Sequence, residues 1–415
     1  MKKKIVGIFV MGLLIGTMLS VVNSVSACTG FTAYDGEKVL VGANMDWSQN
    51  FNMYMHFFPA EEGKFGRVII DLKFALIDWE PYPDDPDWIS PKEGMNDQGL
   101  FYSIFVHPYL LPEKSNDKPI FYSDDPDYYT HALHAYCLAK CKTVSEVLDV
   151  FDDYNLVGMH QYQVFFADRN GDSLIIEGDD IIYKEGDFQV ITNFLHSHPE
   201  LGFYPCWRYE TAVSMLENMN ELSCEYFRSI CNATHQKTTV HSDVYDLREG
   251  IFYVNFNNNF ENPLEFDLNE ELAKGKRRIH IGSLFEPEDN HPPDKPDAPI
   301  GDETGIPGTD YRYSCKKTSD PDGDRIMYLF DWGDGTDSGW IVPQYGTIRA
   351  YHNWTERGNF EVRVKAMDVY GRESEWSDPL SVTMPKNKLY INSLIQNFLE
   401  NHPIIYQLIQ RFLKL

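Results

Sequence analysis

The residue best suited to covalent chemistry is Cys28, because of the segment that precedes it. Residues 1–27 read MKKKIVGIFVMGLLIGTMLSVVNSVSA, in which three lysines stand before an apolar stretch. This pattern is typical of a secretory signal peptide, with an A-x-A-like end at Val25-Ser26-Ala27. Cleavage after Ala27 leaves Cys28 as the first residue. The sequence therefore predicts a secreted chain that begins with a cysteine.

An amino-terminal cysteine has two competing fates. Its thiol has a pKa of about 8.5 and its α-amine one of about 7.7 to 8.0, so the amine is suited to take a proton at neutral pH. The thiolate would then attack a carbonyl and form an acyl-enzyme that water resolves. The alternative is a lipid-modified cysteine, because Val25-Ser26-Ala27-Cys28 also fits a loose lipobox. An acylated amine cannot act as a base, so the two fates exclude each other.

The local sequence brings a carboxylate toward this cysteine. Residues 28–46 read CTGFTAYDGEKVLVGANMD, in which the Asp-Gly pair is a strong signal for a two-residue hairpin turn. Pairing outward from that turn places Cys28 opposite Ala43. Asp46 then lies just beyond the ladder, within reach of the new amino terminus.

Strand and helix patterns alternate irregularly over the following residues. The segment 164–179 predicts a hairpin that turns at Asn-Gly, and 181–194 predicts a strand, a turn and a strand. Apolar spacing predicts helices over 128–153 and 208–231. Because the pattern lacks the regular alternation of a parallel sheet, the fold class is α+β in layers.

Four segments in this order resemble the choloylglycine hydrolase and penicillin V acylase family of amino-terminal nucleophile hydrolases. They are CTGF with GANMDW near the start, EGMNDQGL at 93–100, the hairpin at 164–179 that leads to ITN at 191–193, and YPCWRY at 204–209. The resemblance covers roughly 28–285. It implies a four-layer αββα fold and hydrolysis of linear amide C–N bonds in an N-acylated small molecule, with no cofactor.

The resemblance also implies roles for four residues. Cys28 is the nucleophile and its amine the base, and Asp46 holds that amine. Asn193 donates to the oxyanion, and Arg208 supplies positive charge near the thiol. The structural alternatives are turn-capping or surface roles for Asp46, Asn193 and Arg208.

Two positions depart from the family pattern. The family usually has arginine where this chain has Ala43, and a missing cation there raises the thiol pKa and weakens carboxylate recognition. A second oxyanion donor, often asparagine or tyrosine, falls near Val106 or His107, which leaves a backbone N–H for that role. We therefore expect a substrate other than that of a bile-salt hydrolase. A catalytically inert surface protein is the alternative.

The remaining chain predicts a linker, a second domain and a tail. Residues 286–308 are rich in proline, glycine and acid, as in a linker. Residues 309–384 resemble PKD domains, which are immunoglobulin-like β-sandwiches, through FDWGDGT and YHNWTERGNFEVRVKAMDVYG. Residues 385–415 have the spacing of two short amphipathic helices, for docking, self-association or a membrane surface.

Several other cysteine, histidine and aspartate residues could bind a metal or undergo redox chemistry, but we favour structural roles for most of them. The six remaining cysteines permit disulfides; Cys137 and Cys141 share a helix face, which favours burial or a disulfide over a metal, and Cys206 is a candidate free thiol. His196 and His198 alternate on a strand end without an evident third ligand. Turn capping is favoured over calcium binding for the acidic residues of DPDGD, which are Asp320, Asp322 and Asp324.

Composition limits the classes of partner. The chain has 415 residues, 43% of them hydrophobic, and a formal net charge of −27. This excess of acid argues against a general nucleic-acid binder, since phosphate binding needs clustered Lys and Arg. We expect a small-molecule amide substrate, a secreted or cell-surface location, and surface association through the PKD-like domain and tail, with the oligomeric state open.

Overall fold

The computed structural model describes residues 28–46, 52–72, 91–107, 117–123, 132–156, 162–343, 348–384, 398 and 401–402. The predicted signal peptide and nearly all of the predicted tail lie outside these residues. The chain forms two compact units, which divide between Ile279 and His280. Among the described residues, none of the helices combines the length and apolarity that crossing a membrane requires.

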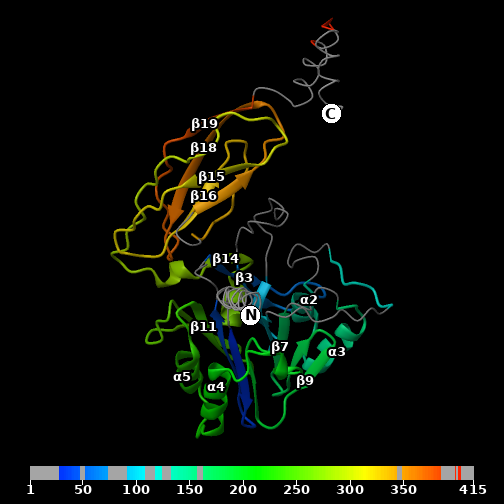
Figure 1. The fold of residues 1–415 in the computed structure, drawn as a ribbon. Coiled ribbons are helices and arrows are strands. Elements are labelled where there is room, and N and C mark those ends of the chain that lie inside the picture. The colour runs from blue at the N-terminus through cyan, green and yellow to red at the C-terminus, as the bar shows by residue number, and fades with distance from the viewer. Residues whose placement is uncertain are drawn as a thin grey trace, which may run out of the picture. The chain divides into compact units, whose positions relative to one another are not determined.

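Two β-sheets form the middle of the first unit (Figure 1). One has the order β10 (Phe188–Ile191), β1 (Thr29–Tyr34), β2 (Val39–Asp46), β11 (Thr239–Asp246), β12 (Ile251–Phe256) and β13 (Leu264–Asp267). The other has the order β14 (Arg277–His280), β3 (Met53–Phe58), β4 (Arg67–Leu72), β5 (Pro91–Asn96), β6 (Leu100–Val106), β7 (Tyr162–Asp168), β8 (Ser173–Glu177) and β9 (Asp180–Tyr183).

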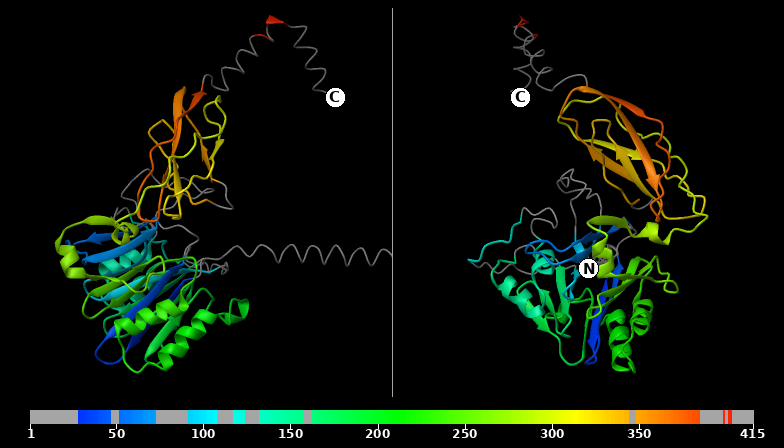
Figure 2. Two further views of the ribbon diagram at one scale, coloured as in Figure 1. Left: turned by 90° about the vertical axis from the view of Figure 1, so that its left-hand side faces the viewer. Right: turned by 180° about the vertical axis from the view of Figure 1, so that it is seen from behind.

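A pair of helices covers the outer face of each sheet, as Figures 1 and 2 show. The pair α4 (Trp207–Glu217) and α5 (Cys224–Thr234) packs on the first sheet through a cluster that includes Phe31 and Phe227. The pair α2 (Leu133–Lys140) and α3 (Val144–Asp152) packs on the second, where Leu138 and Phe166 share a cluster. The predicted four-layer αββα fold is confirmed.

Each predicted helical segment forms a pair of helices, α2 with α3 and α4 with α5, as predicted. Thr143 caps α3 by accepting the backbone N–H of Glu146, and Ser223 caps α5 by accepting that of Tyr226. Such caps satisfy donors at the first turn, so helices begin there. The described residues also form the short elements α6 (Leu268–Ala273), η2 (Pro199–Leu201) and η3 (Gly282–Phe285).

The strand predictions hold. β7 and β8 form the predicted hairpin, and Gly171 supplies its positive φ of 94°. The strands predicted within 181–194 are present as β9 and β10. However, β9 pairs with β8 while β10 pairs with β1, so the turn between them crosses from one sheet to the other.

The predicted register of the first hairpin is wrong by two residues. Tyr34 pairs with Val39 and Gly30 with Ala43, so Cys28 is not opposite Ala43. The cause is the turn, in which the Asp35 carboxylate accepts the backbone N–H groups of Glu37 and Lys38 at 2.9 and 2.8 Å, giving a longer loop. Because the shift is even, every side chain keeps the predicted face of the sheet.

The second unit contains a β-sandwich, as predicted. One sheet pairs β15 (Tyr311–Cys315) with β17 (Ile348–His352), and the other joins β16 (Met327–Asp331), β18 (Gly358–Met367) and β19 (Leu380–Met384). Its buried core includes Tyr313, Trp332 and Trp354.

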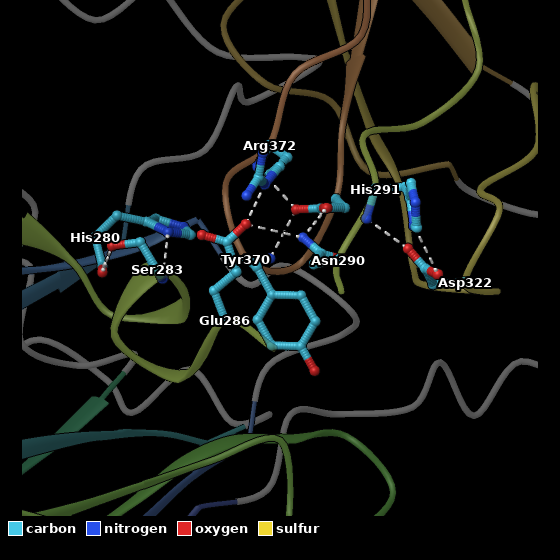
Figure 3. Close-up of polar contacts among 9 residues, drawn as sticks. His280, Ser283, Glu286, Asn290, His291, Asp322, Tyr370 and Arg372 are labelled. Carbon is cyan, nitrogen blue, oxygen red and sulfur yellow. Dashed lines mark hydrogen bonds and ion pairs between the residues drawn. The ribbon is translucent and has the colours of Figure 1, made fainter. Parts of the chain in front are cut away.

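The segment predicted as a linker makes many contacts with this sandwich. Asn290 donates to the Asp368 carboxylate at 2.9 Å, and the His291 backbone N–H donates to Asp322 at 2.6 Å (Figure 3). Arg372 forms an ion pair with Glu286. Further along, Ile300 bridges to Ser314. These residues are held by the sandwich and do not behave as an extended spacer.

Asn96, within the EGMNDQGL segment, ties the turn between β5 and β6 to the end of α2. It is 1% exposed, donates to the carbonyls of Leu138 and Cys141 at 2.7 and 2.8 Å, and accepts the Leu100 N–H at 2.9 Å. We expect Asn96→Ala to lower the free energy of unfolding by about 2–4 kcal/mol, because it leaves buried groups unpaired. Urea unfolding measures this. The exposed Asn218→Ala is the control, and an equal loss in both variants would contradict the assignment.

Candidate active site

Cys28 lies at the start of β1 and is only 5% exposed. Its Sγ is 3.7 Å from the Asp46 carbonyl oxygen and 3.8 Å from Met45 Sδ. These contacts follow from the observed register, in which Thr29 pairs with Asn44. The hairpin therefore brings Cys28 beside the end of β2, as the sequence predicted, although through a different pairing.

Asp46 is fully buried at the end of β2. Its carboxylate accepts hydrogen bonds from Gln236 Nε2 at 2.7 Å and from the Thr239 hydroxyl. Thr239 stands opposite Asp46 on β11, so the sheet itself positions this donor. Burial raises the pKa of Asp46 to about 6, while the bonds from Thr239 and Gln236 oppose that rise. The carboxylate is ionised at neutral pH and fixed in place.

Arg208 joins the site from the first turn of α4 and is 5% exposed. Its Nη1 donates to the Cys28 carbonyl oxygen and, at 2.8 Å, to Thr29 Oγ1. Its Nη2 donates to Asn193 Oδ1 at 3.5 Å. One buried cation thus contacts the first two residues of the predicted mature chain and the predicted oxyanion donor.

Asn193 follows β10, whose pairing with β1 brings it to the same end of the sheet as Cys28. Its Nδ2 donates to the Val106 carbonyl at 2.6 Å. Gln163 Nε2 donates to the carbonyls of Thr192 and Phe194, at 3.2 and 3.0 Å, and so fixes the chain on both sides of Asn193. The structure therefore brings together the four residues named from the sequence.

In the uncleaved chain, the Cys28 thiol is protonated at neutral pH. Burial and the nearby Asp46 carboxylate raise the pKa of Cys28 to about 12, whereas Arg208 acts to lower it. A thiol in this state is a poor nucleophile, because the thiolate is the reactive form. Chemistry at this site needs a base beside the sulfur.

A second polar cluster, which the sequence did not predict, lies deeper in the first unit. Glu93, His241 and Asp243 are fully buried, and one ligand-type atom from each lies within 4.8 Å of the others. His241 Nδ1 is 2.5 Å from Asp243 Oδ2, and Tyr245 donates to Glu93 at 2.8 Å. One imidazole and two carboxylates are ligand types that suit a divalent metal, and two adjacent carboxyls can instead share a proton.

Ala43 lies on β2, between β1 and the strand that carries His241 and Asp243. It pairs with Gly30 on one side and with Asp243 on the other. A small residue thus stands where the family resemblance implies an arginine. Burial raises the pKa of Asp243 to about 7 and that of Glu93 well above its usual range.

The sequence also missed the residues that hold the site in place. Thr239, Gln236 and Gln163 carry no motif, and only strand pairing reveals their contacts. The second predicted oxyanion position is occupied by the Val106 carbonyl, which accepts from Asn193, and by the buried His107.

The remaining candidate metal ligands, which are His196, His198 and the aspartates of DPDGD, contact protein groups. The centroid of the His196 ring lies 4.2 Å from that of the Phe194 ring, with the planes tilted by 31°, and burial lowers the pKa of His196 to about 4. His198 instead lies 3.1 Å from Glu200. Asp320 Oδ1 accepts the N–H groups of Asp322 and Asp324, so turn capping is confirmed, although the three carboxylates also converge.

All seven cysteines have free thiols in the structure. Cys137 and Cys141 are buried together at the end of α2, and Cys206 is partly exposed. Burial, rather than a disulfide, is therefore the observed state of the Cys137 and Cys141 pair.

The buried Asp243 makes folding depend on pH. Its pKa rises from 3.8 to about 7 on folding, so its contribution to stability is complete below the lower value and is lost as pH rises through the upper one. As pH rises from 5 to 8, we expect the free energy of unfolding of Asp243→Asn to increase by about 1–2 kcal/mol relative to that of the wild type. Urea unfolding at both pH values measures this, with the exposed Asp153→Asn as control. Parallel pH profiles for the wild type and Asp243→Asn would refute the shift.

Comparisons with known proteins cover both units. A variant of the conjugated bile acid hydrolase from Clostridium perfringens is 17% identical, with a TM-score of 0.43, over 61% of this chain and 96% of that one. Penicillin V acylase from Agrobacterium tumefaciens is 16% identical, with a TM-score of 0.43, over 60% and 90% of the two chains. The family named from the motifs is thus among the structural neighbours. No curated protein matches the sequence.

The second unit has a match at higher identity. The PKD domain of an M14-like peptidase from Thermoplasmatales archaeon SCGC AB-540-F20 is 42% identical, with a TM-score of 0.21, over 23% of this chain and 99% of that one. The family model of the PKD domain matches residues 293–384. Over these residues the chain belongs to the PKD domain family.

Proposed function

We propose that this protein is a secreted hydrolase that cleaves the linear amide bond of an N-acylated small molecule, with the processed Cys28 as its nucleophile. The observation that carries the proposal is the convergence of Cys28, Asp46, Asn193 and Arg208, which come from the first hairpin, the loop after β10 and α4. Each supplies a group that amide hydrolysis by an amino-terminal thiol needs. The reaction requires no cofactor.

The proposed base is the α-amine that cleavage after Ala27 releases. This amine takes the thiol proton, the sulfur attacks the amide carbonyl, and the amine then protonates the leaving nitrogen. Water attacks the resulting thioester, which releases the acid and regenerates the thiol. Asp46, held by Thr239 and Gln236, balances the charge of the ammonium while it carries the proton.

Asn193 and Arg208 stabilise the negative charges that develop on the oxyanion and on the sulfur during the reaction. The Asn193 amide is the side-chain donor for the oxyanion, and Gln163 fixes its backbone. Arg208 holds the Cys28 carbonyl and lowers the thiol pKa. With Ala43 in place of an arginine, Arg208 is a cation that still acts on the thiol.

The remaining parts of the chain fit an extracytoplasmic enzyme. Residues 1–27 would direct secretion, and the PKD domain suits contact with a cell surface or matrix. The tail would assist surface association or assembly. The competing proposal is an inert or lipid-anchored surface protein, which the pKa of about 12 for the Cys28 thiol favours unless cleavage supplies a base.

The nucleophile has a direct test. We expect Cys28→Ala to reduce hydrolysis of N-acyl amides by about 10³-fold or more, because no other group replaces the attacking sulfur. Cys224→Ser, a partly exposed cysteine on α5, serves as the matched control and keeps wild-type rates. Amino-terminal mass spectrometry shows whether the chain starts at an unmodified Cys28. A diacylglycerol adduct there, or full activity in Cys28→Ala, would overturn the proposal.

The Thr239 hydroxyl is a positioning group for Asp46, and its effect has a predictable sign. Its hydrogen bond favours the ionised carboxylate, so Thr239→Val raises the pKa of Asp46. We expect the acidic limb of the kcat/KM profile to move up by about one pH unit. Thr239→Ser, which keeps the hydroxyl, should restore the limb. A uniform loss of rate with an unmoved limb would show that Thr239 has only a structural role.

A further inference from the structure

The buried cluster of Glu93, His241 and Asp243 joins the two sheets of the first unit. Glu93 lies on β5 of the eight-stranded sheet. His241 and Asp243 stand two residues apart on β11 of the six-stranded sheet, so their side chains share one face of that strand. All three are fully buried, and one ligand-type atom from each lies within 4.8 Å of the others. The side chains therefore meet between the sheets, away from solvent.

The residues that pair with this cluster in the sheets are uncharged. They are Ala43 and Val254 beside Asp243, Met45 and Phe256 beside His241, and Ile70 and Ser103 beside Glu93. Two carboxyl groups, close enough to share a proton, thus lie with one imidazole in mostly apolar surroundings. Burial of a carboxylate there is costly unless a proton or a cation balances its charge.

The hydrogen bonds of the cluster leave two buried atoms unused. His241 Nδ1 is 2.5 Å from Asp243 Oδ2. His241 Nε2, by contrast, has no hydrogen-bond partner among the described residues, and Asp243 Oδ1 likewise lacks a donor there. Buried polar atoms nearly always have a partner, which can be a bound ion. Because an imidazole nitrogen and a carboxylate oxygen are both metal ligands, the unused atoms point to a cation.

Neighbouring groups orient the cluster as they orient the ligands of a metal. The Tyr245 hydroxyl donates to Glu93 Oε1 at 2.8 Å, and the Ser103 hydroxyl donates to Oε2 at 3.2 Å. Two hydroxyl donors favour the ionised form of this carboxyl group and fix its direction. The contact of His241 with Asp243 fixes the imidazole ring in the same way. Metal-binding imidazoles and carboxylates are commonly held by such hydrogen bonds.

We propose that Glu93, His241 and Asp243 bind a divalent transition metal ion, expected to be Zn²⁺, which fastens the two sheets together. One imidazole and two carboxylates match the nitrogen and oxygen ligands of zinc sites, and a carboxylate that binds through both oxygens supplies a fourth bond. The ion balances the two buried negative charges.

The role of this ion is structural. It takes no part in the hydrolysis proposed above, so the site does not depend on that function. The pH dependence predicted for Asp243 belongs to the metal-free protein, and it is measured with a chelator present. In the metal-bound protein the ion takes the place of the protons on the two carboxyl groups.

The zinc content of the full secreted chain tests this proposal. Because the cluster is fully buried, Zn²⁺ is supplied in the growth medium, and the purified protein is dialysed against metal-free buffer. We expect about one zinc per chain by plasma mass spectrometry. Asp243→Asn and Glu93→Gln keep the side-chain size but remove a charged ligand, so each should retain at least about tenfold less zinc. His198→Gln is the matched control and keeps the wild-type content, because His198 is an exposed imidazole beside Glu200.

Two measurements on the wild type make the test independent of how the variants fold. X-ray absorption at the zinc edge should show nitrogen and oxygen ligands without sulfur, although seven free thiols compete for the ion. Urea unfolding should have a higher midpoint for the zinc-loaded protein than for protein prepared with a chelator, because the ion binds the folded chain.

Several results would overturn the metal site. They are a folded wild type without zinc, sulfur among the zinc ligands, equal zinc in the wild type and both variants, or an unfolding midpoint that zinc leaves unchanged. A folded, zinc-free wild type would assign the cluster to a shared proton. The same measurements on Cys28→Ala should match the wild type, so the metal site and the proposed hydrolase stand or fall separately.

Discussion

The bond between the Arg208 guanidinium and the Cys28 carbonyl is the contact on which the candidate site depends. A buried cation is costly unless every donor is used, and Arg208 uses its donors on Cys28, Thr29 and Asn193. These partners come from β1 and from the loop after β10, while Arg208 itself comes from α4. The bond therefore fixes the helix layer to the sheet at the position where the mature chain would begin. A planar, forked side chain is needed for this, so lysine would not replace it.

The carboxylates of Asp46, Glu93 and Asp243 are all buried, but they lie in two different environments. Asp46 receives two neutral donors and lies near Arg208, so its charge is supported although burial raises its pKa to about 6. Glu93 and Asp243 lie next to each other and next to His241, which burial keeps neutral. Burial raises the pKa of both carboxyl groups further than that of Asp46, so it favours their protonated forms. Of these three carboxylates, Asp46 is the one suited to balance a positive charge at neutral pH. The deeper cluster affects stability and its pH dependence. Ala43, which pairs with Asp243, stands where the family resemblance implies an arginine.

Much of this arrangement could be predicted from local sequence, and the failures have specific causes. The signals of turns and apolar spacing located β7 and β8, the four helices and the proximity of Cys28 to Asp46. The register of the first hairpin was wrong because the Asp35 side chain stabilises a longer turn than Asp-Gly alone suggests. Thr239, Gln163 and Glu93 were missed because their roles depend on which strands become neighbours. That information is absent from any single segment.

The geometry also explains why the site would be silent before cleavage. In the uncleaved chain the Cys28 nitrogen belongs to a peptide bond and has no lone pair to accept a proton, while the thiol pKa is about 12. Under the proposed mechanism, removal of residues 1–27 keeps the bonds from Arg208 to the Cys28 carbonyl and to Asn193, and the bond from Thr239 to Asp46, because all of these groups lie beyond the cleaved peptide bond. It adds one amine next to a preformed carboxylate. The fold would thus prepare every charge of the reaction except the base, which secretion itself would supply.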